Sequence, residues 1–252
     1  MSGHSKWSSI KHKKGAADAK RGKLFSKLSR AIIVAAREGG ADPDANATLA
    51  TAIQKARDSS MPKDTIERAI ARGAGATSDG DAAFETVTYE GYGPGGVAVF
   101  VEALTDNRNR TASEVRHIFA KNDGNLGTSG AVAWLFERKG VVLVPAEATD
   151  EDELMLAAAE GGAEDVGLDG SSFQVTSAPD DLAAVRAALE AAGIAYESAE
   201  VTMLPKTTVG IEDQSAAKKL LRLMDALEDN DDVQAVHANF DIPESVLEAV
   251  AA

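Results

Sequence analysis

The spacing of the apolar residues first changes near residue 80, and that change limits the possible folds more than any other feature. Before residue 75 the apolar residues recur at helical spacing, and after residue 80 they alternate as they do in strands. The segment between, Gly75 to Gly80, is a linker of mostly small residues. The pattern therefore predicts an α+β protein with a helical domain ahead of one or more sheets.

The part before the linker contains signals for three helices. The first runs from about Lys20 to the pair Gly39-Gly40, the second from Asn46 to Arg57, and the third from Pro62 to Gly73. On the first helix the apolar residues fall on one side; they are Leu24, Phe25, Leu28, Ile32, Ala35 and Ala36. We expect these helices to pack into a small N-terminal domain, residues 1–75.

Charge is distributed unevenly along the chain. The first thirty residues contain nine Lys or Arg and one acid, although the whole chain has a formal net charge of −14. Residues 76–252 contain 11 basic and 33 acidic residues, a net of −22. On the first helix the cations lie within an arc of about 100°, away from the apolar residues. Because a polyanion would repel the rest of the chain, this pattern indicates nucleic-acid binding by the N-terminal end alone.

After the linker the alternation predicts a β-hairpin. Val87 and Tyr89 precede the turn Gly93 to Gly96, and Val97, Val99 and Val101 follow it. Thr111 and Glu114 have the spacing of a capping box, so we expect a helix to begin there and to end near Gly124.

From Gly140 the order of elements is strand, helix, strand, strand, helix, strand, which is the ferredoxin-like arrangement. The expected ranges are 141–144, 149–160, near 166, 172–176, 180–192 and 195–203, with Thr149 as the first helix cap. A helix around Leu220 and a strand over 233–240 remain. Because a lone helix and strand cannot form a domain, we expect them to complete the domain begun by the hairpin. The predicted division is a split middle domain of residues 81–137 and 205–252, with a ferredoxin-like domain of residues 138–204 inserted in it.

Several patterns suggest enzyme or metal chemistry, but their spacing or their neighbouring elements argue against it. Gly91 to Gly96 fits G-x-G-x-x-G, but a strand rather than a helix follows it, so a dinucleotide site is not expected. The acidic runs Asp150 to Glu153 and Asp225 to Asp232 lack the spacing of a calcium loop, and we interpret them as solvated helix ends. The histidines lack metal spacing; they are His4, His12, His117 and His237. We expect no cofactor, no metal and no enzyme activity, and an undetected hydrolase is kept as a third alternative.

The absence of cysteine and of any apolar run long enough for a membrane favours a cytoplasmic protein with no membrane partner. The segment Asp106 to Arg110 lies between a predicted strand and a predicted helix and has two readings. Either Arg108, Asn109 and Arg110 make a second phosphate contact, or the arginines pair with nearby acids in a structural loop.

Six stretches resemble the YebC family of probable transcriptional regulatory proteins, which is related to mitochondrial translational activators. The stretches are Gly3 to Trp7, Lys11 to Lys14, Met61 to Asp64 with Ile66 to Ile70, Tyr89 to Ala98, Leu104 to Thr111, and Asp231 to Gln234 with Asn239-Phe240. Ser60 and Thr65 stand where the family pattern commonly has Asn, and Asp123 and Ala131 where it commonly has Gly and Ser. The resemblance implies three domains, with a ferredoxin-like one inserted in the middle one, and a regulator without catalysis.

The resulting hypothesis is a regulator of gene expression that binds duplex DNA as a transcription factor. The alternative is a translation factor that binds ribosomal RNA and the translating ribosome, with the acidic domains facing a protein partner. The strongly acidic body mildly favours the alternative. The residues that we predict to bind nucleic acid are Lys6, Trp7, Lys11, His12, Lys13, Lys14, Lys20, Arg21, Lys23, Lys27 and Arg30.

Overall fold

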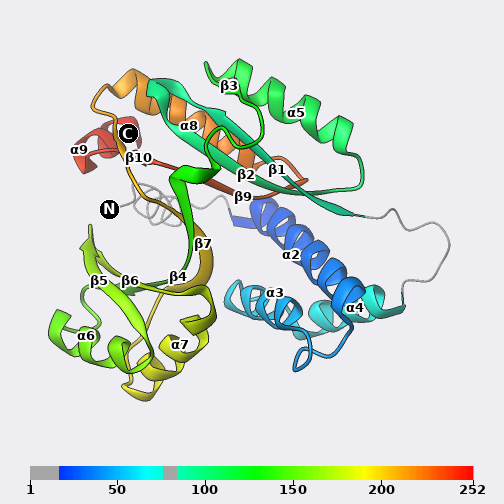
Figure 1. Cartoon of the computed structure of the whole chain (residues 1–252), viewed down its shortest axis with the longest axis vertical. Helices are drawn as coiled ribbons and strands as arrows, with labels where there is room; N and C mark the ends of the chain where they lie inside the picture. The colour runs from blue at the N-terminus through cyan, green and yellow to red at the C-terminus, as the bar shows by residue number, and fades with distance from the viewer. Residues whose placement is uncertain (1–16, 76–83, 252) are drawn as a thin grey trace.

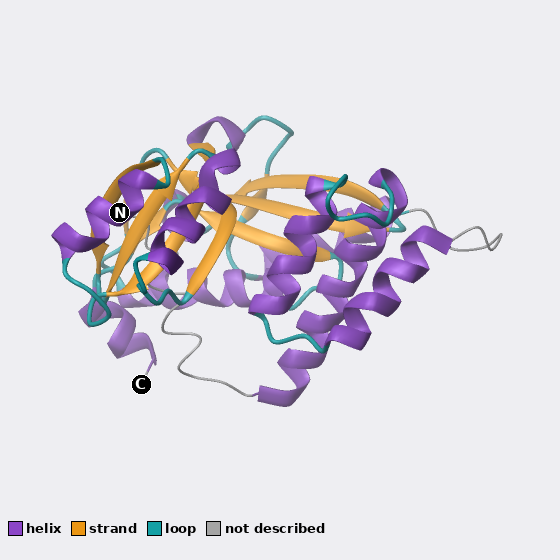
Figure 2. Cartoon of the chain, turned by 90° about the horizontal axis from the view of Figure 1, so that it is seen from below, coloured by secondary structure: helices purple, strands orange, loops and turns teal. Residues whose placement is uncertain are grey.

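The computed structural model describes residues 17–75 and 84–251. Helices at the N-terminal end lie beside two four-stranded sheets, each covered by helices (Figure 1). The view from below shows helices lying beside the strands (Figure 2). The α+β class predicted from the periodicity is therefore confirmed.

Within residues 17–75 three helices form the N-terminal unit: α2 (Ala17–Gly39), α3 (Ala47–Asp58) and α4 (Lys63–Gly75). Their core contains Leu28, Ile32, Leu49 and Ile66. Leu24, which the spacing placed on the packed side, is 42% exposed. The prediction was wrong there because the buried residues that α2 gives to this core begin one turn later, at Leu28.

Two residues with side chains adopt left-handed backbone angles. Ser60 has φ 57° and Asp123 has φ 58°, and both follow the end of a helix. These are two of the positions where the resembled family commonly has Asn or Gly, the residues that tolerate this conformation best. Ser60 and Asp123 therefore keep these turns at a small cost in backbone strain.

The first sheet has the strand order β3-β1-β2-β9, with all neighbours antiparallel. Its strands are β1 (Glu85–Tyr92), β2 (Ala98–Thr105), β3 (Asn125–Leu126) and β9 (Val233–Ala238). Helices α5 (Arg108–Lys121) and α8 (Gln214–Glu228) share a core with this sheet through Val115, Phe119, Leu220 and Met224. The hairpin is confirmed, and its turn contains the short helix η1 (Pro94–Gly96).

The second sheet has the order β5-β6-β4-β7, again antiparallel. Its strands and helices are β4 (Phe136–Pro145), α6 (Glu151–Glu160), β5 (Ala163–Asp169), β6 (Ser172–Ser177), α7 (Leu182–Ala191) and β7 (Ser198–Pro205). This is the ferredoxin-like arrangement, and all of it lies in sequence between β3 and β9 of the first sheet. Asp150, not Thr149, caps α6, because its side chain accepts a hydrogen bond from the Glu153 amide at 2.9 Å.

The remaining elements are short. They are η2 (Ala133–Leu135), η3 (Pro179–Asp181), β8 (Val209–Gly210), β10 (Phe240–Asp241) and α9 (Glu244–Ala251). Strands β8 and β10 pair in parallel, so the strand expected over 233–240 is divided into two. No helix within residues 17–75 and 84–251 is long and apolar enough to span a membrane.

Glu90 fixes the loop that joins the two sheets. Its buried carboxylate accepts hydrogen bonds from the amides of Gly130, Val132 and Ala133 at 2.6 to 2.7 Å. Burial alone would raise the pKa of Glu90, but the three amides outweigh it and the pKa is lowered. The carboxylate therefore acts as a charged anchor for the loop that leads from β3 into β4.

Candidate nucleic-acid interface

The predicted binding residues divide into two groups. Lys6, Trp7, Lys11, His12, Lys13 and Lys14 lie outside the described residues, and of Lys20 only its place in helix α2 is described. Arg21, Lys23, Lys27 and Arg30 follow one another along α2. Arg21 is exposed, and its guanidinium lies 5.3 Å from the centre of the Phe25 ring.

Three of these cations are bonded to other parts of the protein. Lys23 Nζ donates to the main-chain oxygen of Asp229 at 3.1 Å, and Lys27 Nζ donates to that of Glu228. Both acceptors lie at the C-terminal end of α8, where unpaired carbonyls and the helix dipole attract cations. Because Lys23 and Lys27 are bonded to the end of α8 in this structure, the expectation that this whole face of α2 is free for phosphate is corrected for these two residues.

Lys27 shows the electrostatic cost of this contact. Burial lowers the pKa of Lys27, and the nearby charges of Glu228, Asp231 and Asp229 only partly offset that effect. The cation is thus partly desolvated and is held by an acidic surface.

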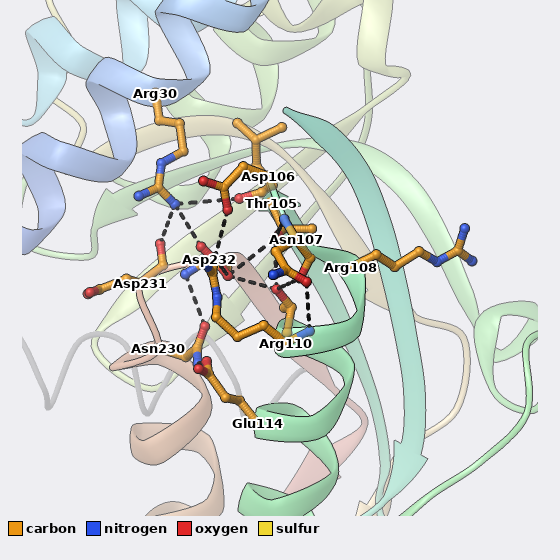
Figure 3. A network of polar contacts seen from close by, with 12 residues as sticks. Arg30, Thr105, Asp106, Asn107, Arg108, Arg110, Glu114, Asn230, Asp231 and Asp232 are labelled. Carbon is orange, nitrogen blue, oxygen red and sulfur yellow. Dashed lines mark hydrogen bonds and ion pairs between the residues drawn. The ribbon is translucent and has the colours of Figure 1, made fainter. Parts of the chain in front are cut away.

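Arg30 continues the contact into a buried network. Its Nη1 donates to the main-chain oxygen of Asp231 at 2.9 Å and to Asp232 Oδ1 at 3.2 Å (Figure 3). The guanidinium also lies 5.2 Å from the centre of the Phe84 ring. Arg30 therefore joins the N-terminal helices to the first sheet.

Asp232 is the centre of that network. Its Oδ2 accepts hydrogen bonds from Arg110 Nη2 and Thr111 Oγ1, both at 2.7 Å, and from Thr105 Oγ1 at 3.3 Å. Burial would raise the pKa of Asp232, but the hydrogen bonds from Arg110 and Thr111 and the positive charges of Arg110 and Arg30 lower it overall. The interpretation of the acidic run 225–232 as a solvated helix end is wrong for Asp232, which is 5% exposed.

The loop before α5 contains the predicted second phosphate contact, and its residues differ in bonding and exposure. Asn107 caps α5 by accepting from the Arg110 amide at 3.1 Å, so the helix begins one turn before the predicted capping box. Thr111 lies inside the helix instead and bonds to Asp232. Arg110 pairs with Asp106 and Asp232, whereas Arg108 and Asn109 are exposed and the Arg108 side chain points away from the network (Figure 3).

Two hollows meet at Arg30 and Phe84. One has a volume of about 470 Å³, and five of its lining residues are acidic: Asp106, Glu114, Asp229, Asp231 and Asp232. The other has a volume of about 450 Å³, lies against α2 and α4, and has no acidic lining residue. Its lining residues are Phe25, Ser26, Ser29, Arg30, Ile33, Arg37, Thr65, Arg72 and Phe84. We call these the acidic hollow and the arginine groove.

Sequence reasoning missed Asp232, Thr105 and His237. The nitrogen Nδ1 of the buried His237 lies 3.3 Å from Thr202 Oγ1, and Nε2 lies 3.9 Å from a carboxylate oxygen of Glu102, so this histidine contacts both sheets. Among the described residues no group of three His, Asp or Glu side chains is placed to hold a metal ion. The signal for Asp232 was present in the sequence, because stretches 104–111 and 231–234 both carried the family resemblance and they meet at this carboxylate.

The comparisons with known proteins match the chain from end to end. A model of the TACO1/YebC N-terminal domain matches residues 5–76, and a model of the second and third domain matches residues 84–240. The chain belongs to the TACO1/YebC family. A family member from Rubrobacter xylanophilus is 66% identical over 252 residues, which is 100% of both chains. One from Natranaerobius thermophilus is 57% identical over 251 residues, covering 98% of this chain and 99% of its own. Both are named probable transcriptional regulatory proteins.

A solved structure of a family member is also similar. The crystal structure of a conserved hypothetical protein from Aquifex aeolicus has a TM-score of 0.80 and 54% sequence identity. The match covers 90% of this chain and 93% of that chain. The TACO1/YebC fold described above thus has an experimental counterpart.

Proposed function

We propose that this chain is a nucleic-acid-binding regulator of gene expression that binds through residues 1 to about 37. The observation that carries the proposal is the charge distribution, with nine cations and one acid in thirty residues of a chain whose net charge is −14. The names of the relatives support a regulatory role. The proposal involves no catalytic step and no cofactor.

The contacts of α2 refine which residues carry the binding. Lys23, Lys27 and Arg30 are bonded to residues 228–232, so a phosphate would have to displace those bonds to reach them. Arg21, on the first turns of the same helix, is exposed. We therefore assign most of the affinity to the N-terminal segment and the first turns of α2.

The first test is the salt dependence of binding. Deleting residues 1–19 removes Lys6, Lys11, Lys13 and Lys14, and should flatten the slope of log K against log salt by up to about four. A matched control removes four exposed cations from the acidic body by changing Lys121, Lys206, Lys218 and Arg222 to Gln. The control should keep the slope, and an unchanged slope in the deletion variant would contradict the proposal.

The choice between duplex DNA and ribosomal RNA is the second test. The relatives are named probable transcriptional regulatory proteins, which favours a regulator of transcription. The net charge of −22 over residues 76–252 favours the alternative, because a repelling body suits a factor that enters an RNA-lined site by one end. Sedimentation of the tagged protein with ribosomes, lost after ribonuclease treatment, would select the ribosome, whereas retention on operator DNA in the same lysate would select transcription.

A further inference from the structure

The helical unit formed by α2, α3 and α4 has an apolar core of its own. Its buried cluster runs from Leu28 to Ala69. None of the apolar clusters among the described residues contains members from both this unit and the two sheets. Domains whose interface lacks a large apolar core are expected to move relative to one another. The shared core of the three helices means that they would move as one body.

Polar contacts hold the helical unit in place, on two of its sides (Figure 1). On the side of the first sheet, α2 is bonded through its three paired cations to residues 228–232. On the side of the second sheet, Lys55 Nζ of α3 lies 2.8 Å from Glu200 Oε2 of β7. These two side chains are 49% and 44% exposed, so water can replace the pair at a small cost.

Release of the helical unit would leave no buried charge without a partner. When Arg30 leaves, Asp232 keeps the hydrogen bonds from its three donors on β2 and α5. The bond from Lys23 to the oxygen of Asp229 is exposed, so water can take its place. Burial lowers the pKa of Lys27 in the docked position, and this cation would regain hydration. The docked contact is therefore reversible.

The docked position places acids beside the helix that we propose to bind nucleic acid. Glu228, Asp229 and Asp231 all act electrostatically on Lys27. The acidic hollow, which has five acids in its lining, includes Lys23 and Arg30. A phosphate backbone along α2 would be repelled by these acids and would compete with them for the cations.

We propose that docking of the helical unit is autoinhibitory: the acidic surface at residues 228–232 shields α2 from nucleic acid, and binding of a phosphate backbone releases the unit from both sheets. This regulation rests on the proposed nucleic-acid function. The apparent affinity is reduced to the extent that the released form is rare. A change that weakens docking should therefore tighten binding, wherever in the interface it lies.

The ion pair between Lys55 and Glu200 gives a test in which two explanations differ in sign. The probes are a DNA duplex of about 20 base pairs, roughly twice as long as α2, and a single RNA strand of as many nucleotides. Lys55→Gln and Glu200→Gln each remove the pair, so each should tighten binding by the full chain about two- to fivefold. Long-range attraction alone predicts that loss of the cation weakens binding. The double variant should bind no more tightly than either single one, because the pair is lost only once.

A second ion pair supplies the matched control. Lys139 Nζ lies 2.7 Å from Glu164 Oε2, and both residues belong to the second sheet, so this pair does not touch the helical unit. Lys139→Gln and Glu164→Gln should not both tighten binding.

Release can also be measured directly, because the chain contains no cysteine. Thr51→Cys on α3 and Ser215→Cys on α8 introduce two exposed thiols for a pair of fluorescent dyes. Energy transfer between the dyes should change when the bound probe releases the helical unit.

The outcomes separate this regulation from the proposed function. If a probe binds but Lys55→Gln and Glu200→Gln shift the affinity in opposite directions or not at all, autoinhibition is wrong and the proposed function stands. Constant energy transfer up to saturation with a probe that binds has the same meaning. If the chain binds neither probe, both proposals are contradicted.

Discussion

The acidic hollow and the arginine groove have similar volumes, about 470 and 450 Å³, and share Arg30 and Phe84, but their other lining residues differ in charge. In the acidic hollow, Arg30 faces the carboxylate of Asp232 and the carbonyl of Asp231. In the arginine groove, the same side chain lies beside two further arginines and no acid. The cation is identical, and only the neighbours that the fold brings to each side differ.

The difference teaches that cations on one helix can have neighbours of very different charge. One side of α2 holds the helical unit to the first sheet, and the other side lines the arginine groove. Counting cations along a helix therefore overestimates the number that can meet phosphate.

The largest effect is expected from Asp232→Ala, because this buried carboxylate accepts from Arg110, Thr111, Thr105 and Arg30. Removing one partner of a buried charge network costs about 3 kcal/mol, since the remaining groups lose their bonds without regaining water. Urea unfolding measures the loss. Asp231→Ala is the control; the Asp231 side chain is exposed and points away from the network, so its cost should stay within about 0.5 kcal/mol (Figure 3). Equal costs for the two variants would mean that Asp232 is not the centre of the network.

The same carboxylate should make stability depend on acid. The pKa of Asp232 is lowered in the folded chain, so its ionised form stabilises the fold above the pKa of the unfolded chain, near 4. This contribution should be lost as the pH falls from about 4 through the lower folded pKa. The free energy of unfolding, measured between pH 7 and pH 2, should therefore fall more steeply for the natural chain than for Asp232→Asn. Parallel curves would show that other carboxylates control the acid limit.

Arg110 and Arg108 form a matched pair on the first turn of α5. Arg110→Gln should cost about 1 kcal/mol, discounted because the Arg110 side chain is 44% exposed, since it removes the pairs with Asp232 and Asp106. Arg108→Gln should not alter stability measurably. If the loop makes a second phosphate contact, Arg108→Gln should instead weaken nucleic-acid binding and Arg110→Gln should not. Loss of stability with Arg108→Gln together with loss of binding with Arg110→Gln would contradict this interpretation of the loop.

The smallest effect on stability is expected along α2 itself. Changing Lys23 and Lys27 to Gln should cost about 1 kcal/mol or less, because these partly exposed lysines lose bonds to the end of α8. Changing Lys20 and Arg21 to Gln alters the charge equally on the same helix. That second pair should leave the melting temperature unchanged and weaken nucleic-acid binding. A loss of binding with the first pair alone would place the phosphate-binding residues on the face that we assign to α8.

Much of the fold could be predicted because periodicity is a local property. The alternation around Gly93 to Gly96 predicted the hairpin, and the order of elements after Gly140 predicted the ferredoxin-like sheet. The predicted starts of two helices were wrong, because a single capping side chain decides where a helix begins. Asn107 and Asp150 cap α5 and α6, although Thr111 and Thr149 also had the residue type of a cap. Helix α9 was not predicted at all.

The sequence by itself determined how much charge the protein has and at which end the cations lie. Only the tertiary structure decided which of those cations are already paired. Lys23 and its acceptor on Asp229 are 206 positions apart, and Arg30 and Asp232 are 202 apart. Electrostatic attraction depends on distance in space and on burial, not on separation along the chain. The return of α8 and β9 to the first sheet, after the whole of the second sheet, is what brings these acids to α2.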